Sequence, residues 1–193
     1  MMAMMKPLIL SFLAVAFICI SSRGVASQAT VTYDTLAGKS FPVPQGVKNQ
    51  LFYIQRTPNT NTIIYQLNVD EHGKLNERQP IHPFWIRYQE DSSFQELNYI
   101  QKNYAYGLKF NRMDKEKYEV HFVSYKKYVI YLMRDRQDGQ FKAYTDMDGK
   151  LGILNKIYLH IEGGSFWFPK VVYVEVSGID PVTQAERKVR FKP

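Results

Sequence analysis

Short aromatic and β-branched runs, separated by turn-forming residues, dominate the sequence from Gln50 to the C-terminus. Tyr, Phe, Val and Ile are prominent in these runs, and such side chains favour the pleated, half-buried surface of a β-strand. The pattern therefore predicts a mainly β protein. The predicted strands cover residues 50–56, 62–69, 83–89, 105–110, 118–124, 128–134, 141–145, 153–162, 171–177 and 185–191.

The connections between these runs are short and contain residues that suit tight reversals. Asp138-Gly139 and Asp148-Gly149 are of this kind, because Gly, Asn and Asp tolerate the positive φ of a hairpin turn. Hairpin connections make neighbouring strands antiparallel. We therefore expect a mainly antiparallel sheet of about nine strands, which either closes as a β-barrel or folds as a sandwich.

One short α-helix is predicted over residues 94–104. Ser93 and Glu96 have the spacing of a capping box, in which each side chain bonds a free backbone amide of the first helical turn. Apolar side chains then recur at helical spacing up to Tyr104. This helix is expected to lie on the sheet or to plug it.

Residues 1–29 have the order of a secretory signal peptide. A basic residue precedes an apolar run over residues 7–20, and Ser27 and Ala29 are the small side chains that a signal peptidase reads. Cleavage is expected after Ala29, with Ala26 as the second possibility. The apolar run is too short for a comfortable membrane span, so no transmembrane segment is expected after cleavage. These features predict a secreted or periplasmic protein.

Beyond the predicted cleavage site, the sequence divides into a lead-in and one domain. Residues 30–49 hold two prolines and two glycines among few apolar residues. That composition is typical of a tether or an ordered lead-in rather than of a core element. Residues 50–193 suit a single β-rich domain, which is expected to be a monomer.

The mature chain would carry a small positive charge and no cysteine. The whole chain has 25 Lys and Arg against 18 Asp and Glu, and the basic residues are spread along it, as on solvated faces. Its one cysteine, Cys19, lies in the predicted signal, so no disulfide, thiol nucleophile or thiolate metal site would remain. The sequence also lacks Asn-x-Ser/Thr acceptor sites, which favours a bacterial envelope or periplasmic location.

Two predicted strands each place a histidine and a carboxylate on one face. Alternation puts Glu119 and His121 together on one strand, and His160 and Glu162 together on another. Solvent exposure with cross-strand charge pairs is the simpler interpretation. If the two strands lay close together, the four side chains could contact a ligand or form an acid–base or metal site. No His-x-His spacing occurs, and no bound metal is expected.

One predicted central strand has bulky side chains on both faces, with Trp85 and Arg87 on the same face. Because such a strand is covered on both sides, Arg87 needs a partner such as Glu90 or Glu96, or a bound anion. Arg56, at the end of the first predicted strand, is a similar but weaker candidate.

Trp167 lies in an aromatic segment behind two glycines, Gly163 and Gly164. An exposed segment of this kind could meet a membrane interface or stack on carbohydrate. A buried one would close one end of the barrel, and we favour that interpretation.

The sequence lacks common signatures of catalysis and of nucleotide or nucleic-acid binding. It has no Gly-x-Ser-x-Gly motif, phosphate-binding loop, dinucleotide-binding pattern, zinc-protease motif or RNA-binding aromatic motif. No cofactor and no nucleic-acid partner are therefore expected, and a non-enzymatic protein is favoured.

Four distinctive segments follow one another in the sequence: QLFYIQRTPNTNTIIYQLNVDEHGKLN, HPFWIRYQED, ELNYIQKNYAYGLKF and GGSFWFPKVVYVEVSGIDP. Together they resemble domain-of-unknown-function family 4833, a family of similar size found largely in bacterial exported proteins. The resemblance covers residues 50–193 and implies a single exported domain. It assigns no functional residues, because the segments contain no known catalytic signature.

Three functional hypotheses follow from the sequence. The first is a binding module that holds a small apolar or amphipathic ligand inside a barrel, or an envelope glycan on an aromatic face. The second is a hydrolase that uses the Glu119/His121 and His160/Glu162 pairs. The third is a structural envelope protein that pairs with a partner through a sheet edge or its basic C-terminal strand.

Overall fold

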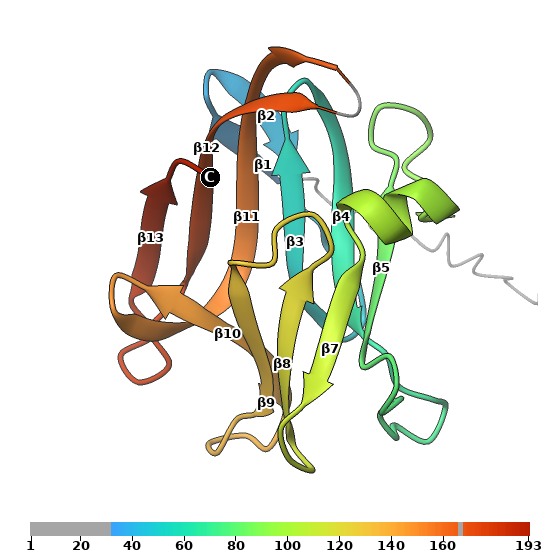
Figure 1. The fold of residues 1–193 in the computed structure, drawn as a ribbon, viewed down its shortest axis with the longest axis vertical. Helices are drawn as coiled ribbons and strands as arrows, with labels where there is room; N and C mark the ends of the chain where they lie inside the picture. Colours follow the sequence, from blue (N-terminus) through green and yellow to red (C-terminus); the bar gives the residue numbers. More distant parts are fainter. Residues whose placement is uncertain (1–31, 166–167) are drawn as a thin grey trace, which may run out of the picture. The chain divides into compact units, whose positions relative to one another are not determined.

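The computed structural model describes residues 32–165 and 168–193 (Figure 1). The predicted signal peptide and Trp167 lie outside these ranges. Within them, no helix has the length and the apolar composition needed to cross a membrane.

One long strand, β11 (Lys150–Gly164), connects the different parts of the fold. Its first residues pair antiparallel with β10 (Phe141–Met147), and farther along the same edge it pairs parallel with β3 (Gln50–Arg56). Its other edge pairs antiparallel with β12 (Pro169–Ile179). The sheet therefore divides at β11, where β10 and β3 leave the same edge one after the other (Figure 1).

Seven further strands complete this 11-stranded sheet. From β3 the sheet continues through β4 and β5 to β6, from β10 it continues through β9 and β8 to β7, and β13 borders β12. Every neighbouring pair except β3 and β11 is antiparallel. These strands are β4 (Asn59–Leu67), β5 (Ile81–Ile86), β6 (Phe94–Glu96), β7 (Leu108–Arg112), β8 (Lys117–Phe122), β9 (Val129–Arg134) and β13 (Glu186–Phe191).

The sheet curls into a half-barrel because aromatic side chains from its two arms pack against each other. Phe52 of β3 and Tyr65 of β4 stack with ring centroids 4.4 Å apart. Phe122 of β8 meets both rings edge-on, at 6.4 and 5.8 Å. All three side chains belong to the main buried cluster. Burying rings of this size is among the largest contributions a small core can receive.

The prediction of a mainly β protein is confirmed, and each of the ten predicted segments overlaps a strand. The large sheet has eleven strands rather than about nine. The sheet is neither a closed barrel nor a sandwich. It is a single sheet that curves as a barrel does but stays open.

The predicted start of the helix is wrong. Residues 94–96 form the edge strand β6 and pair with β5, while the helical segment covers residues 99–105 and is a π-helix over Gln101–Ala105. The reciprocal capping bonds join Asn98 and Gln101 instead. Asn98 Oδ1 accepts a hydrogen bond from the Gln101 amide at 2.9 Å, and Gln101 Oε1 accepts one from the Asn98 amide at 3.0 Å.

Gly107 follows the helical segment at a point where two stretches of backbone meet. A Cβ on this residue would lie 1.7 Å from the carbonyl oxygen of Lys102, so only glycine fits. The close approach lets the chain pass directly from the helical segment into β7.

Part of the predicted lead-in is packed against the sheet. Strands β1 (Tyr33–Leu36) and β2 (Lys39–Pro42) form a separate hairpin. Phe41 is 1% exposed and meets Tyr158 of β11 edge-on at 5.5 Å. Gln55 Nε2 also donates a hydrogen bond to the Pro42 carbonyl oxygen at 2.8 Å. The hairpin thus covers one face of β3 and β11.

The hydroxyl group of Thr57 extends the contact between β3 and β11 beyond the end of β3. It donates a hydrogen bond to the Ile161 carbonyl oxygen at 2.9 Å and accepts one from the Ile161 amide at 2.7 Å. Thr57 is 4% exposed, and its own amide bonds the Leu159 carbonyl oxygen at 3.2 Å. These bonds fix the position of the neighbouring residue Arg56 relative to β11.

Replacing Thr57 by Val keeps the shape of the side chain but leaves both backbone groups of Ile161 without this partner. We expect Thr57→Val to lower the free energy of unfolding by about 2 kcal/mol, measured by urea denaturation. Thr57→Ser keeps the hydroxyl group and should lose less than about half as much. Equal losses in the two variants would contradict this role of the hydroxyl group.

Candidate functional site

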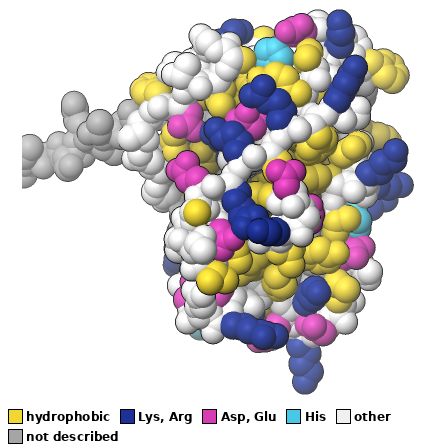
Figure 2. Space-filling model, turned by 90° about the vertical axis from the view of Figure 1, so that its left-hand side faces the viewer, with side chains coloured by type: hydrophobic (Ala, Val, Ile, Leu, Met, Phe, Trp, Pro, Cys, Tyr) yellow, Lys and Arg dark blue, Asp and Glu magenta, His cyan; other side chains and the backbone are white. Residues whose placement is uncertain are grey.

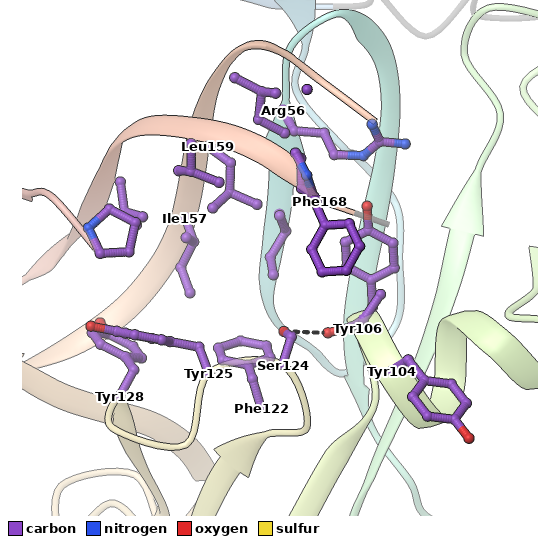
Figure 3. A pocket seen from close by; sticks show the side chains of 18 of the residues that line it. Arg56, Tyr104, Tyr106, Phe122, Ser124, Tyr125, Tyr128, Ile157, Leu159 and Phe168 are labelled. Carbon is purple, nitrogen blue, oxygen red and sulfur yellow. Dashed lines mark hydrogen bonds between the residues drawn. The ribbon is translucent and has the colours of Figure 1, made fainter. Parts of the chain in front are cut away.

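The concave face of the half-barrel holds a cavity of about 1020 Å³ (Figure 3). Its walls are mainly apolar and come from distant parts of the sheet. Ile54 is in β3, Phe122 in β8, Ile157 and Leu159 in β11, and Val174 in β12. The volume is at the upper end of the roughly 300–1,000 Å³ typical of small-molecule sites.

Strand alternation explains why the cavity is apolar. Ile157, Leu159 and Ile161 lie on the cavity side of β11. His160 and Glu162 alternate with them and therefore point to the other side of the sheet. The sequence pattern predicted this separation of faces, but it did not show that the apolar face lines an open space.

Arg56 lies at one end of the cavity (Figure 3). Its guanidinium carbon is 5.4 Å from the centre of the Trp85 ring and 5.8 Å from that of Tyr106. Its Nε atom is buried and has no hydrogen-bond partner among the described residues. The ion pairs within residues 32–165 and 168–193 do not include Arg56. A cation whose charge has no carboxylate partner among the described residues can bind an anion.

A smaller polar pocket of about 260 Å³ adjoins this end and shares Arg56 and Gln101 with the cavity. Trp85 Nε1 donates a hydrogen bond to Gln101 Oε1 at 3.2 Å. Amide and charged side chains supply most of the remaining lining, including Asn61 and Arg87. Together, the two spaces form one site with a long apolar part and a short polar part.

Tyrosine side chains lie at the opposite end of the cavity. Figure 3 shows Tyr125 and Tyr128 there, far from Arg56 in the same view. The Tyr128 hydroxyl group is buried without a hydrogen-bond partner among the described residues. Burial raises the pKa of Tyr128 to about 12, so the group is a neutral hydrogen-bond donor at ordinary pH.

Hydrogen bonds hold the helical segment at the rim of the cavity. Ser124 Oγ donates to the Ala105 carbonyl oxygen at 2.6 Å, as drawn in Figure 3, and Tyr65 OH donates to the Tyr106 carbonyl oxygen at 2.8 Å. Tyr104 also belongs to this rim, although its ring points away from the cavity in the same view. Backbone hydrogen bonds therefore hold the segment in place at the rim.

The Glu/His pairs predicted from the sequence are two separate local contacts. Glu119 Oε1 lies 2.8 Å from His121 Nε2 on β8, and Glu162 Oε1 lies 2.8 Å from His160 Nε2 on β11. Strands β9 and β10 separate β8 from β11 in the sheet, and neither pair lines the cavity. The described residues contain no group of three or more His, Cys, Asp or Glu placed to hold a metal ion.

Trp85 and Arg87 both line the small polar pocket. Arg87 Nε donates to Glu90 Oε1 at 3.0 Å, and Arg87 also bonds Gln95, so its charge already has a partner. Glu96, the other partner considered, lies 2.7 Å from His82 and 3.1 Å from Lys102. Trp167 lies outside the described residues.

Strand β13 forms one edge of the sheet, and its basic side chains are largely used within the fold. Arg190 pairs with Glu175 at 2.7 Å and lies 4.1 Å from the centre of the Tyr173 ring. Arg187 pairs with Asp180. Figure 2 shows Lys and Arg side chains scattered over this side of the molecule rather than gathered in one patch. Charges on an edge strand oppose pairing with another sheet.

Comparison with known proteins identifies the family. The model of DUF4833, a domain of unknown function, matches residues 52–190. The chain belongs to the DUF4833 family. Searches of curated proteins and of solved structures gave no significant match. The matched region of this DUF4833 protein runs from β3 to β13, so it contains both arms of the sheet and most of the cavity wall.

Proposed function

We propose that this DUF4833 protein is an exported binding protein that holds an apolar or amphipathic small molecule in the half-barrel. The observation that carries the proposal is the large apolar cavity, which ends in a small polar pocket at Arg56. Neither Glu/His pair lines the site, so the hydrolase hypothesis has no support from its geometry. Binding without chemistry is therefore the function that the geometry supports best.

The apolar walls can supply most of the binding free energy. Moving a methylene group from water into an apolar site gains about 0.8 kcal/mol, and the cavity is large enough for a chain of many such groups. The strands that form the walls are joined by backbone hydrogen bonds, so little ordering is needed when a ligand enters. A dissociation constant in the micromolar range or below is consistent with this apolar burial and this small ordering cost.

A larger side chain inside the cavity should weaken binding. We expect a neutral probe, N-phenylnaphthylamine, to bind the purified wild-type protein with a rise in fluorescence. Leu159→Trp places a ring in the cavity and should weaken probe binding by about tenfold or more, which corresponds to about 1.4 kcal/mol.

Glu162→Trp is the matched control, because it adds the same ring to the opposite face of the same strand. It should bind the probe as the wild type does, and thermal unfolding should show that both variants are folded. If the wild type does not bind the probe, or if the two tryptophan variants behave alike, the proposed function is wrong.

The location is part of the same proposal. The order of charge, apolar run and small residues over 1–29 and the absence of cysteine after Cys19 support export through a cleaved signal. When the full chain is produced in a bacterial host, we expect the exported fraction to begin at Thr30, or at Ser27 if the second site is used. Intact-protein mass spectrometry of the periplasmic or secreted fraction tests this. Full-length protein confined to the cytoplasm would contradict it.

A further inference from the structure

We infer that the ligand is a linear acyl chain ending in a carboxylate, and that Arg56 binds that carboxylate. This inference rests on the proposed function and deepens it, because it names the chemical class of the ligand. The two adjoining spaces would then bind different parts of the ligand. The small polar pocket receives the head group, and the apolar cavity receives the chain.

The charges around the polar pocket are balanced except at Arg56. Arg87 is paired with Glu90, and Glu96 lies between His82 and Lys102. Arg56 has Trp85 and Tyr106 rings beside its guanidinium group and a buried Nε atom without a partner among the described residues. A half-buried cation in this state is costly, and an anion that accepts its hydrogen bonds removes that cost.

The form of the unpaired group favours a carboxylate. A guanidinium group is a planar fork that binds the two oxygens of a carboxylate in parallel. A carboxylate carries one negative charge, which matches the single positive charge left unpaired here. A phosphate monoester carries about −1.5 to −2 charges at neutral pH, and the other arginine of the pocket, Arg87, is already bound to Glu90.

The order of the lining residues along the cavity suits a linear chain. Arg56 lies at one end and Tyr128 at the other, with Leu159 and Ile157 along the wall between them (Figure 3). A chain bound at Arg56 would follow these side chains, and each methylene group would contact apolar atoms. The Tyr128 hydroxyl group lies where the far end of such a chain would be.

The test compares three ligands that share one chain and differ in the head group. Hexadecanoic acid, hexadecanol and hexadecyl phosphate compete with N-phenylnaphthylamine at neutral pH and below the concentrations at which they aggregate. We expect the wild type to bind the acid roughly tenfold or more tightly than the alcohol, because the alcohol has no negative charge and only one oxygen to accept hydrogen bonds from Arg56. The phosphate should bind more weakly than the acid.

Arg56→Gln should bind the alcohol as the wild type does and lose the preference for the acid. Arg56→Lys keeps the charge without the fork and should retain part of the preference. Arg136→Gln removes an exposed arginine away from the site and is the matched control. Probe affinity and thermal unfolding of each variant show that the cavity is intact.

Two outcomes would overturn the inference while leaving the proposed function standing. In the first, the wild type binds the probe but does not distinguish the acid from the alcohol. In the second, Arg56→Gln prefers the acid over the alcohol as strongly as the wild type and the control Arg136→Gln do. Failure of the wild type to bind the probe or any of the three ligands would instead overturn the proposed function itself.

Discussion

The parallel pairing between β3 and β11 is the constraint on which the rest of the structure depends. It joins residues separated by about a hundred positions, and the Thr57 hydroxyl group extends it with two hydrogen bonds to Ile161 across a separation of 104 residues. Because β10 and β3 occupy successive parts of the same edge of β11, the two arms of the sheet begin at one strand and then diverge. The space between the arms is the cavity, and Arg56 lies where β3 ends beside it.

Local sequence patterns predicted ten of the thirteen described strands, because aromatic and β-branched runs mark them, and missed β1, β2 and β6. The alternation of apolar side chains also identified which residues of β11 share a face, and turn chemistry predicted a mainly antiparallel sheet. The helix prediction failed at its start for a reason that no local pattern contains. Residues 94–96 pair with β5, and this pairing competes with the helical conformation that Ser93 and Glu96 suggest.

The candidate site was only partly accessible from the sequence. Trp85, Arg87 and Arg56 could be singled out as members of covered strands, and the structure brings all three to the small polar pocket. The sequence names Glu90 as a possible partner of Arg87, and these two side chains are bonded in the structure. No local pattern shows that Arg56 is left without a carboxylate partner among the described residues. Phe122 and Tyr128 could not be predicted as wall residues, because they reach the cavity only when the two arms fold together. Periodicity within one strand does not show how separate strands meet.

The long separation between β3 and β11 also has a consequence for the order in which the chain can fold. β1 and β2 lie near the beginning of the chain, but Phe41 of their hairpin packs against Tyr158. Neither this hairpin nor β3 can complete its contacts until the chain has been made as far as β11. Contacts of such high sequence separation form slowly, because the intervening loop must close first. The edge of β3 that pairs with β11 and the ring of Phe41 therefore stay without these partners until β11 has reached them.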